Sequence, residues 1–264
     1  MPTINPDPTA YPDVNTLLTE LLKNIQAVLG NHFIGMYLDG SLTSGDFDLA
    51  SDIDFVVVTD EDIFGDLFLA LQAMHERIAA IDTPLAIQLE GSYISKHAVR
   101  RYDPEHALHP NIERGEGEQL KMADHSEPWS IHRYVLCQRG ITITGPAPQT
   151  LIDPVSPDEL RQAMLPTLHG WAKHILNHPD EINGRGYQSY TVLTLCRILY
   201  TLQTGDVASK PAAARWAKET LGEKWASIID RALIGRKNGG LAIDPEDVTA
   251  TLDFIRYAIE SSQQ

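Results

Sequence analysis

The chain has 264 residues, of which 43% are hydrophobic and 22% charged, and its 36 acidic and 21 basic side chains give a formal net charge of −15. This composition is typical of a folded globular protein of one or two domains and excludes a largely disordered chain. The apolar runs are too short to span a bilayer, two cysteines cannot build a disulfide framework, and the N-terminus lacks a secretion-signal pattern. We therefore expect a cytosolic protein with no membrane partner.

The negative charge is concentrated in the first part of the chain. Residues 1–150 hold 22 acidic and 9 basic side chains, whereas residues 151–264 hold 14 and 12. No Lys or Arg lies between Lys23 and Arg77. Such a field repels the phosphates of nucleic acids, so we expect no nucleic-acid partner. Charge alone leaves open whether the acids form a solvated face or a site for cations.

The first 156 residues predict a small mixed sheet with flanking helices. Helical spacing of apolar residues covers 15–29 and 63–80, and short β-prone runs predict strands at 33–38, 53–58 and 85–93. A polar loop is expected at 40–45 and a long loop or lid at 102–127. A helix at 129–138 and a strand at 141–144 precede a Pro-rich linker at 145–157.

The second part of the chain predicts helices almost throughout. Apolar residues recur at helical spacing in five segments: 157–176, 187–203, 210–221, 224–234 and 245–261. We therefore expect an α+β protein with a catalytic domain at 1–156 and an all-α helical bundle at 157–264.

The candidate metal and phosphate ligands are concentrated between residues 38 and 59. Asp52 and Asp54 are two residues apart at the start of a predicted strand, so both carboxylates project from one face. Paired carboxylates suit Mg²⁺, and Gly40 with Ser41 after the preceding strand suits a phosphate. Glu90, on the polar face of the third predicted strand, can serve as a further metal ligand or as a general base.

These features together resemble the nucleotidyltransferase superfamily typified by DNA polymerase β. The resemblance implies that Gly40 and Ser41 hold the β- and γ-phosphates and that Asp52, Asp54 and Glu90 bind Mg²⁺. An acceptor group would then attack the α-phosphate, and pyrophosphate would leave.

Two helical segments narrow this resemblance. VLTLCRILY at 192–200 and SKPAAARWA at 209–217 look like the C-terminal domain of the aminoglycoside adenylyltransferases, which modify streptomycin and spectinomycin. This resemblance implies that Glu90 is the general base and that Lys210 contacts ATP. It implies an ATP- and Mg²⁺-dependent transfer of AMP to a hydroxyl of a small cationic molecule bound between the domains. We expect the chain to act as a monomer.

The chain departs from the family pattern between residues 183 and 190. In the drug-modifying enzymes an acidic stretch after a tryptophan leads into the 192–200 helix and helps to hold the drug. Here Trp171 is followed by a longer insert, Arg185 is cationic, and Tyr187 and Tyr190 are neutral. We therefore expect this surface to attract an amine less strongly.

Other sites and functions were weighed against this interpretation. His174 and His178 are four residues apart, but no cysteine or acid at a usual spacing completes a zinc set, so we expect no zinc site. The chain contains no Gly-Lys pair, which excludes a Walker-type phosphate loop. Two alternative functions stay open: a nucleotide-binding sensor without turnover, and a nucleotidyltransferase that AMPylates proteins.

Overall fold

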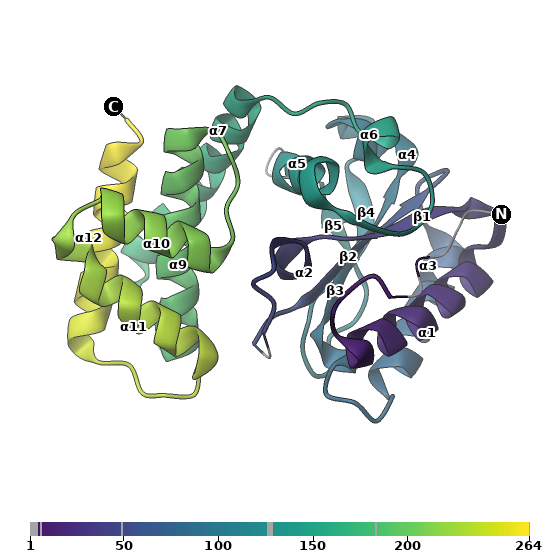
Figure 1. Cartoon of the computed structure of the whole chain (residues 1–264), viewed down its shortest axis with the longest axis horizontal. Helices are drawn as coiled ribbons and strands as arrows, with labels where there is room; N and C mark the ends of the chain where they lie inside the picture. Colours follow the sequence, from purple (N-terminus) through teal and green to yellow (C-terminus); the bar gives the residue numbers. More distant parts are fainter. Residues whose placement is uncertain (1–4, 6, 49, 126–128, 183, 264) are drawn as a thin grey trace. The chain divides into compact units, whose positions relative to one another are not determined.

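The computed structural model describes residues 5, 7–48, 50–125, 129–182 and 184–263 (Figure 1). The chain divides into two compact units, Met1–Pro154 and Val155–Gln264. The first is here called the N-terminal unit and the second the C-terminal unit. Each has a hydrophobic core of its own.

A six-stranded mixed sheet forms the centre of the N-terminal unit, with the strand order β5-β4-β3-β2-β1-β6. The strands are β1 (Phe33–Leu38), β2 (Ile53–Thr59), β3 (Leu89–Ser95), β4 (Leu108–Ile112), β5 (Lys121–Asp124) and β6 (Ile141–Thr144). β2 and β3 are parallel, and the other neighbouring strands are antiparallel. The mixed sheet expected from the sequence is confirmed.

Helices cover both faces of this sheet (Figure 1). α1 (Pro12–Leu29) and α3 (Gly65–Ala79) pack on the face that receives Ile53, Phe55 and Val57 of β2. α4 (Lys96–Arg100), α5 (Ser130–Arg139) and α6 (Pro148–Leu151) lie on the face that receives Val56 and Val58. Because side chains alternate along a strand, Asp54 points to this second face, the one that α5 covers.

The long loop expected at 102–127 is wrong for about half of its described residues. The described part of this segment contains a 3-10 turn, Pro104–His106, and the antiparallel strands β4 and β5 at the edge of the sheet. The sequence of β4, LHPNI, carries a histidine, a proline and an asparagine, so it lacks the apolar run that marks a strand. Its pairing with the edge of β3 determines its structure instead.

Two shorter predictions are also corrected. Residues 40–45 are not an open loop, because Gly40–Ser44 forms the short helix α2, whose N-cap Asp39 accepts a hydrogen bond from the Gly40 amide. Residues 85–88 are not strand, because Ala86–Gln88 is a 3-10 turn and β3 begins only at Leu89. The alternation of apolar residues at 85, 87 and 89 does not match burial in the turn, where Ala86 is buried and Leu85 and Ile87 are partly buried.

The C-terminal unit is helical, as expected. Its helices are α7 (Pro157–Pro166), α8 (Lys173–Asn177), α9 (Arg185–Thr204), α10 (Lys210–Thr220), α11 (Ala226–Lys237) and α12 (Pro245–Ser261). α9 packs against α10, α11 and α12, and residues such as Val192, Cys196 and Phe254 are fully buried around it.

The helix expected at 157–176 is interrupted. A π-helical segment, Thr167–Ala172, separates α7 from α8 and follows Pro166. Proline has no amide hydrogen and its ring obstructs the preceding turn, so the regular α-helical ladder cannot continue through it. Trp171 lies in this segment.

Candidate functional site

Four carboxylates from three neighbouring strands meet in the N-terminal unit. Asp54 of β2 and Glu90 of β3 are direct partners in the parallel register. The backbone amide of Asp39, which follows β1, donates to the carbonyl oxygen of Asp54 over 3.1 Å. Asp52 precedes β2 and has the same alternation as Asp54. The three acids expected to bind Mg²⁺ are therefore placed together, and Asp39 joins them.

Burial and mutual repulsion favour the protonated forms of two of these acids. Desolvation by burial, followed by the charges of Asp39, Glu90 and Asp52, raises the pKa of Asp54 to about 7. Desolvation and the charge of Asp52 also raise the pKa of Glu90. Such a cluster is stable in its ionised form only with cations close by, and strongly shifted pKa values are common at functional sites.

Two basic side chains offset part of this charge. His132 of α5 lies with Nδ1 2.7 Å from a carboxylate oxygen of Asp39, whose side chain is only 6% exposed. Arg114, between β4 and β5, forms an ion pair with Asp52 and donates to the carbonyl oxygen of Ala50 over 3.2 Å. His132 lowers the pKa of both Asp54 and Glu90, and Arg114 lowers that of Glu90.

A cradle of backbone and hydroxyl lies beside these acids. Gly40 has a φ of +62°, and a Cβ at this position would lie 1.9 Å from Oδ2 of Asp54, so only glycine fits. The Oγ of Ser41 is buried and has no hydrogen-bond partner among the described residues. Buried hydroxyls are normally paired, so this one is available to a bound group. An unpaired donor beside hard oxygen ligands fits a phosphate and Mg²⁺.

Five of the six site residues expected from the sequence come together here: Gly40, Ser41, Asp52, Asp54 and Glu90. Three further contributors, Asp39, His132 and Arg114, were not predicted. Asp39 is adjacent to Gly40 in the motif, and its position as the cap of α2 is the signal that could have identified it. His132 and Arg114 have no comparable sequence signal, because tertiary structure alone brings them to the site.

Lys210, the sixth residue, belongs to the C-terminal unit. It is the first residue of α10, after the N-cap Ser209, and its Nζ lies 5.7 Å from the ring centroid of Tyr190. Tyr190 stacks on Tyr187 and meets Trp171 edge to face, at centroid distances of 6.1 and 5.8 Å. Trp171 donates from Nε1 to the hydroxyl of Tyr187 over 3.2 Å. A lysine and three aromatic rings thus form one connected cluster.

The cationic residue of this departing segment lies in a buried ion-pair network. Arg185 forms an ion pair with Asp247, which also pairs with Arg231, and the side chain of Asp247 is only 3% exposed. The Arg185 side chain is itself 11% exposed. Arg185 therefore lies inside the unit, beside a carboxylate that it shares with Arg231, and the weaker attraction of this surface for an amine stays a prediction. Asn183, the first residue of that segment, lies outside the described residues.

Comparison with known proteins finds similarity in both parts of the chain. Residues 150–257 match the family model of the aminoglycoside adenylyltransferase C-terminal domain. The chain is 26% identical to a spectinomycin 9-adenylyltransferase of Staphylococcus aureus over 259 residues, covering 92% of this chain and 94% of that relative. It is 30% identical over 125 residues to an aminoglycoside (3'') (9) adenylyltransferase of Escherichia coli, covering 46% and 45%.

The fold is shared with a solved structure. The spectinomycin adenyltransferase AAD(9) of Enterococcus faecialis, crystallised with ATP and spectinomycin, aligns with a TM-score of 0.72 at 17% identity, over 94% of this chain and 99% of that one. This likeness confirms the expected α+β fold. Within the described part of the chain, every helix is too short or too polar to cross a membrane.

Proposed function

We propose that the chain is an aminoglycoside adenylyltransferase, since residues 150–257 match the family model of the C-terminal domain and the chain is similar to a spectinomycin 9-adenylyltransferase over 92% of its length. It would transfer AMP from ATP to a hydroxyl group of an aminoglycoside or aminocyclitol antibiotic such as spectinomycin. In this reaction the hydroxyl oxygen bonds to the α-phosphorus of ATP. The bond from that phosphorus to the bridging oxygen breaks, pyrophosphate leaves, and the hydroxyl proton passes to a base. The observation that carries the proposal is the register pairing of Asp54 with Glu90 beside the buried, unpaired hydroxyl of Ser41.

We assign the nucleotide side of the reaction to the cradle and the acids. Gly40 lets a phosphate approach the backbone, and the Ser41 hydroxyl donates to it. Asp52 and Asp54, with Glu90, would hold Mg²⁺, which when bound supplies positive charge that stabilises the transferring phosphoryl group. Lys210 contacts the phosphates of ATP from the C-terminal unit.

Glu90 is the base that takes the hydroxyl proton. Its burial and its proximity to Asp52 raise its pKa, which strengthens the carboxylate as a proton acceptor near neutral pH. A carboxylate exposed to water at its ordinary pKa would hold the proton too weakly to assist. In this proposal Asp52 and Asp54 serve as metal ligands alone, whereas Glu90 also accepts a proton.

The acceptor is a small cationic molecule with free hydroxyls. The negative excess of residues 1–150 favours the approach of an amine. The aromatic side chains of Trp171, Tyr187 and Tyr190 offer flat apolar surface with polar edges, which suits a sugar or cyclitol ring.

The test is transfer of label from [α-³²P]ATP in the presence of Mg²⁺ and either spectinomycin or streptomycin. We expect label on the antibiotic and release of pyrophosphate. Glu90→Gln should bind ATP normally but lose transfer, whereas Glu113→Gln, which removes a half-exposed carboxylate paired with Lys121, should retain it. Full turnover by Glu90→Gln would disprove the assignment of the base.

The same assay separates the alternatives. Label on a protein would favour protein AMPylation, and ATP binding without pyrophosphate release with any acceptor would favour a nucleotide sensor. A second readout is growth of a susceptible bacterium on spectinomycin and on streptomycin, with and without expression of the chain. Unchanged sensitivity to both drugs would contradict an antibiotic substrate.

A further inference from the structure

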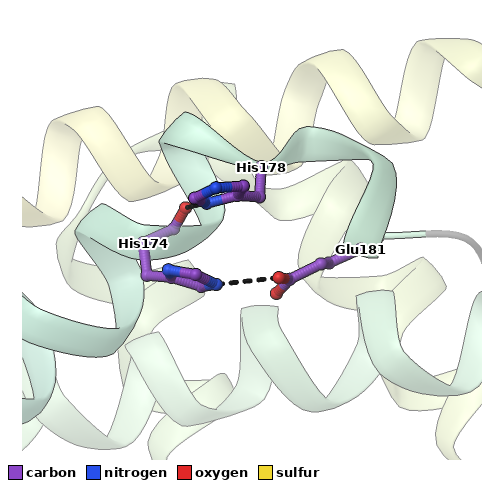
Figure 2. Close-up of side chains that lie close together, drawn as sticks. All are labelled: His174, His178 and Glu181. Atoms are coloured by element: carbon purple, nitrogen blue, oxygen red, sulfur yellow. Dashed lines mark hydrogen bonds and ion pairs between the residues drawn. The ribbon is translucent and has the colours of Figure 1, made fainter.

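Two histidines and a glutamate gather on the surface of the C-terminal unit (Figure 2). His174 lies in α8, His178 directly follows that helix, and Glu181 ends the 3-10 turn Pro179–Glu181. The Nε2 atom of His174 lies 2.7 Å from Oε1 of Glu181, and the two imidazole rings stack with centroids 4.2 Å apart. The three side chains each offer one ligand atom, and these atoms all lie within 4.8 Å of one another.

The backbone holds this arrangement in place. The amide of His178 donates to the carbonyl oxygens of His174 and Ile175, and the amide of Glu181 donates to the carbonyl oxygen of His178. Pro179 ends the α-helix and turns the chain, so that Glu181 comes back beside His174. On either side, Ile175 and Ile182 are buried, which anchors the segment to the core of the unit. The ligand atoms therefore project from a fixed backbone.

Hydrogen bonding determines which nitrogen of His178 is free. Its Nδ1 lies 3.1 Å from the carbonyl oxygen of His174. A carbonyl oxygen only accepts, so Nδ1 carries the hydrogen and Nε2 holds the lone pair. Donation from Nδ1 to a backbone carbonyl is the usual way in which a metal-binding histidine is oriented. His178 is thus presented in the tautomer that binds a metal through Nε2.

The spacing of the ligand atoms suits a tetrahedral metal. Bonds of about 2.0–2.1 Å to nitrogen and oxygen place the ligand atoms of a tetrahedral zinc ion about 3.3 Å apart. The 2.7 Å contact between His174 and Glu181 would open by about 0.6 Å, and the remaining separations, below 4.8 Å, would close to the same value. Rotation of exposed side chains achieves both changes without moving the backbone, since 52% of the His174 side chain and 40% of the Glu181 side chain are exposed.

We propose that His174, His178 and Glu181 bind a divalent transition-metal ion of the zinc class, with solvent in the fourth position. Two imidazoles and one carboxylate favour Zn²⁺, Co²⁺, Ni²⁺ or Cu²⁺ over Mg²⁺, which prefers an all-oxygen set. The sequence expectation of no zinc site rested on the lack of a third ligand at a usual spacing, and Glu181 supplies that ligand. The site is independent of the transfer reaction proposed above.

Binding of the ion links the end of α8 to the turn that precedes α9. α9 carries Tyr187 and Tyr190, so the metal fixes the segment leading into the aromatic cluster. Because the ion binds the folded form, it raises the melting temperature of the C-terminal unit.

The experiment uses the full chain without a polyhistidine tag, stripped with EDTA and then desalted. Zn²⁺ is titrated calorimetrically in the presence of excess Mg²⁺, and Co²⁺ is followed by visible absorption. We expect saturation at about one Zn²⁺ per chain and cobalt bands typical of tetrahedral nitrogen and oxygen ligands. His174→Gln, His178→Gln and Glu181→Gln should each weaken Zn²⁺ binding by at least about tenfold.

His169→Gln is the matched control, because His169 is an exposed histidine of the same unit outside the cluster. It should bind Zn²⁺ like the unchanged chain. Circular dichroism checks that each variant is folded. The proposal is overturned if the unchanged chain binds no Zn²⁺, or if the three cluster variants bind it as tightly as His169→Gln, since the ion would then lie elsewhere.

Discussion

Replacing the buried acid at the centre of the nucleotide site should make the metal-free protein more stable and inactive. In the folded chain the pKa of Asp54 is about 7, against an ordinary value of 3.8, because burial and three neighbouring acids oppose its ionisation. A folded pKa above the unfolded one means that the native state binds more protons between these values, so stability falls as the pH rises through that window. Asp54→Asn removes this titration and keeps the shape of the side chain.

The size of this stability change follows from the pKa shift of Asp54. A difference of about three pKa units corresponds to about 4 kcal/mol of unfolding free energy lost by the ionised native state above pH 7. At pH 5 only about 1.5–2 kcal/mol of this is lost, because the native carboxyl is still protonated there. The stability advantage of Asp54→Asn should therefore grow by about 2–3 kcal/mol between pH 5 and pH 8.

Amide hydrogen exchange of peptides from β1, β2 and β3 measures this gain in the N-terminal unit alone, in EDTA at both pH values. Asp60→Asn is the matched control: the hydrogen bond from His32 lowers the pKa of Asp60, so the same substitution should bring no gain on raising the pH. A gain for Asp54→Asn that does not change with pH would refute the electrostatic reasoning. So would a variant that is less stable than the unchanged chain at pH 8.

Three further substitutions test other parts of the structure. Gly40→Ala should lower the free energy of unfolding by about 1–3 kcal/mol, because position 40 has a positive φ, and should abolish AMP transfer, because the added Cβ displaces Asp54. A normal melting temperature and normal turnover would contradict the role of Gly40 in the phosphate cradle. Burial lowers the pKa of His75 to about 4, whereas the unfolded chain protonates this histidine below about pH 6.5. The free energy of unfolding therefore decreases as the pH falls from about 6.5 toward about 4. His75→Gln should therefore reduce the loss of stability between pH 7 and pH 5 by about 2 kcal/mol in urea titrations, and an unchanged loss would exclude His75 as its cause. Asp247→Ala should lower the unfolding free energy of the C-terminal unit by about 3–5 kcal/mol, because it leaves the buried charge of Arg185 without its carboxylate partner. Tryptophan fluorescence in urea measures this change, and a loss below about 1 kcal/mol would show that the ion pair contributes little to stability.

Elements with a strong local signal were predicted well from the sequence. The apolar runs of β1 and β6 and the helical spacing of α12 match the structure at both ends. The strands β4 and β5 were missed, because LHPNI and KMAD lack the apolar run that marks a strand, and pairing with neighbouring strands determines their conformation. The interruption at Thr167–Ala172 was also missed, since a proline inside an otherwise periodic segment changes the hydrogen bonding without changing the pattern.

In the candidate site, too, residues with a local sequence signal were predicted and residues positioned by the tertiary fold were missed. Asp52 and Asp54 could be placed on one face because alternation along a strand is a local rule, and Glu90 was predicted because it lies on the polar face of the next expected strand. The partners that compensate these acids, His132 and Arg114, come from elements whose approach is a property of the tertiary fold. Glu181 escaped prediction for a different reason, since the turn at Pro179 brings it back to His174 at an unusual ligand spacing.

The ion pair between Arg114 and Asp52 bears on how this protein matures. Small metal-dependent domains stay unfolded until their ion arrives, because their ligands repel one another or lack any other partner. Here a guanidinium supplied by the chain already balances one carboxylate, and the raised pKa of Asp54 lets a proton balance another. Part of the charge repulsion in the N-terminal unit is therefore relieved by the chain itself and by a bound proton, so folding of this unit should depend less on a supply of cations than folding of a small metal-dependent domain does.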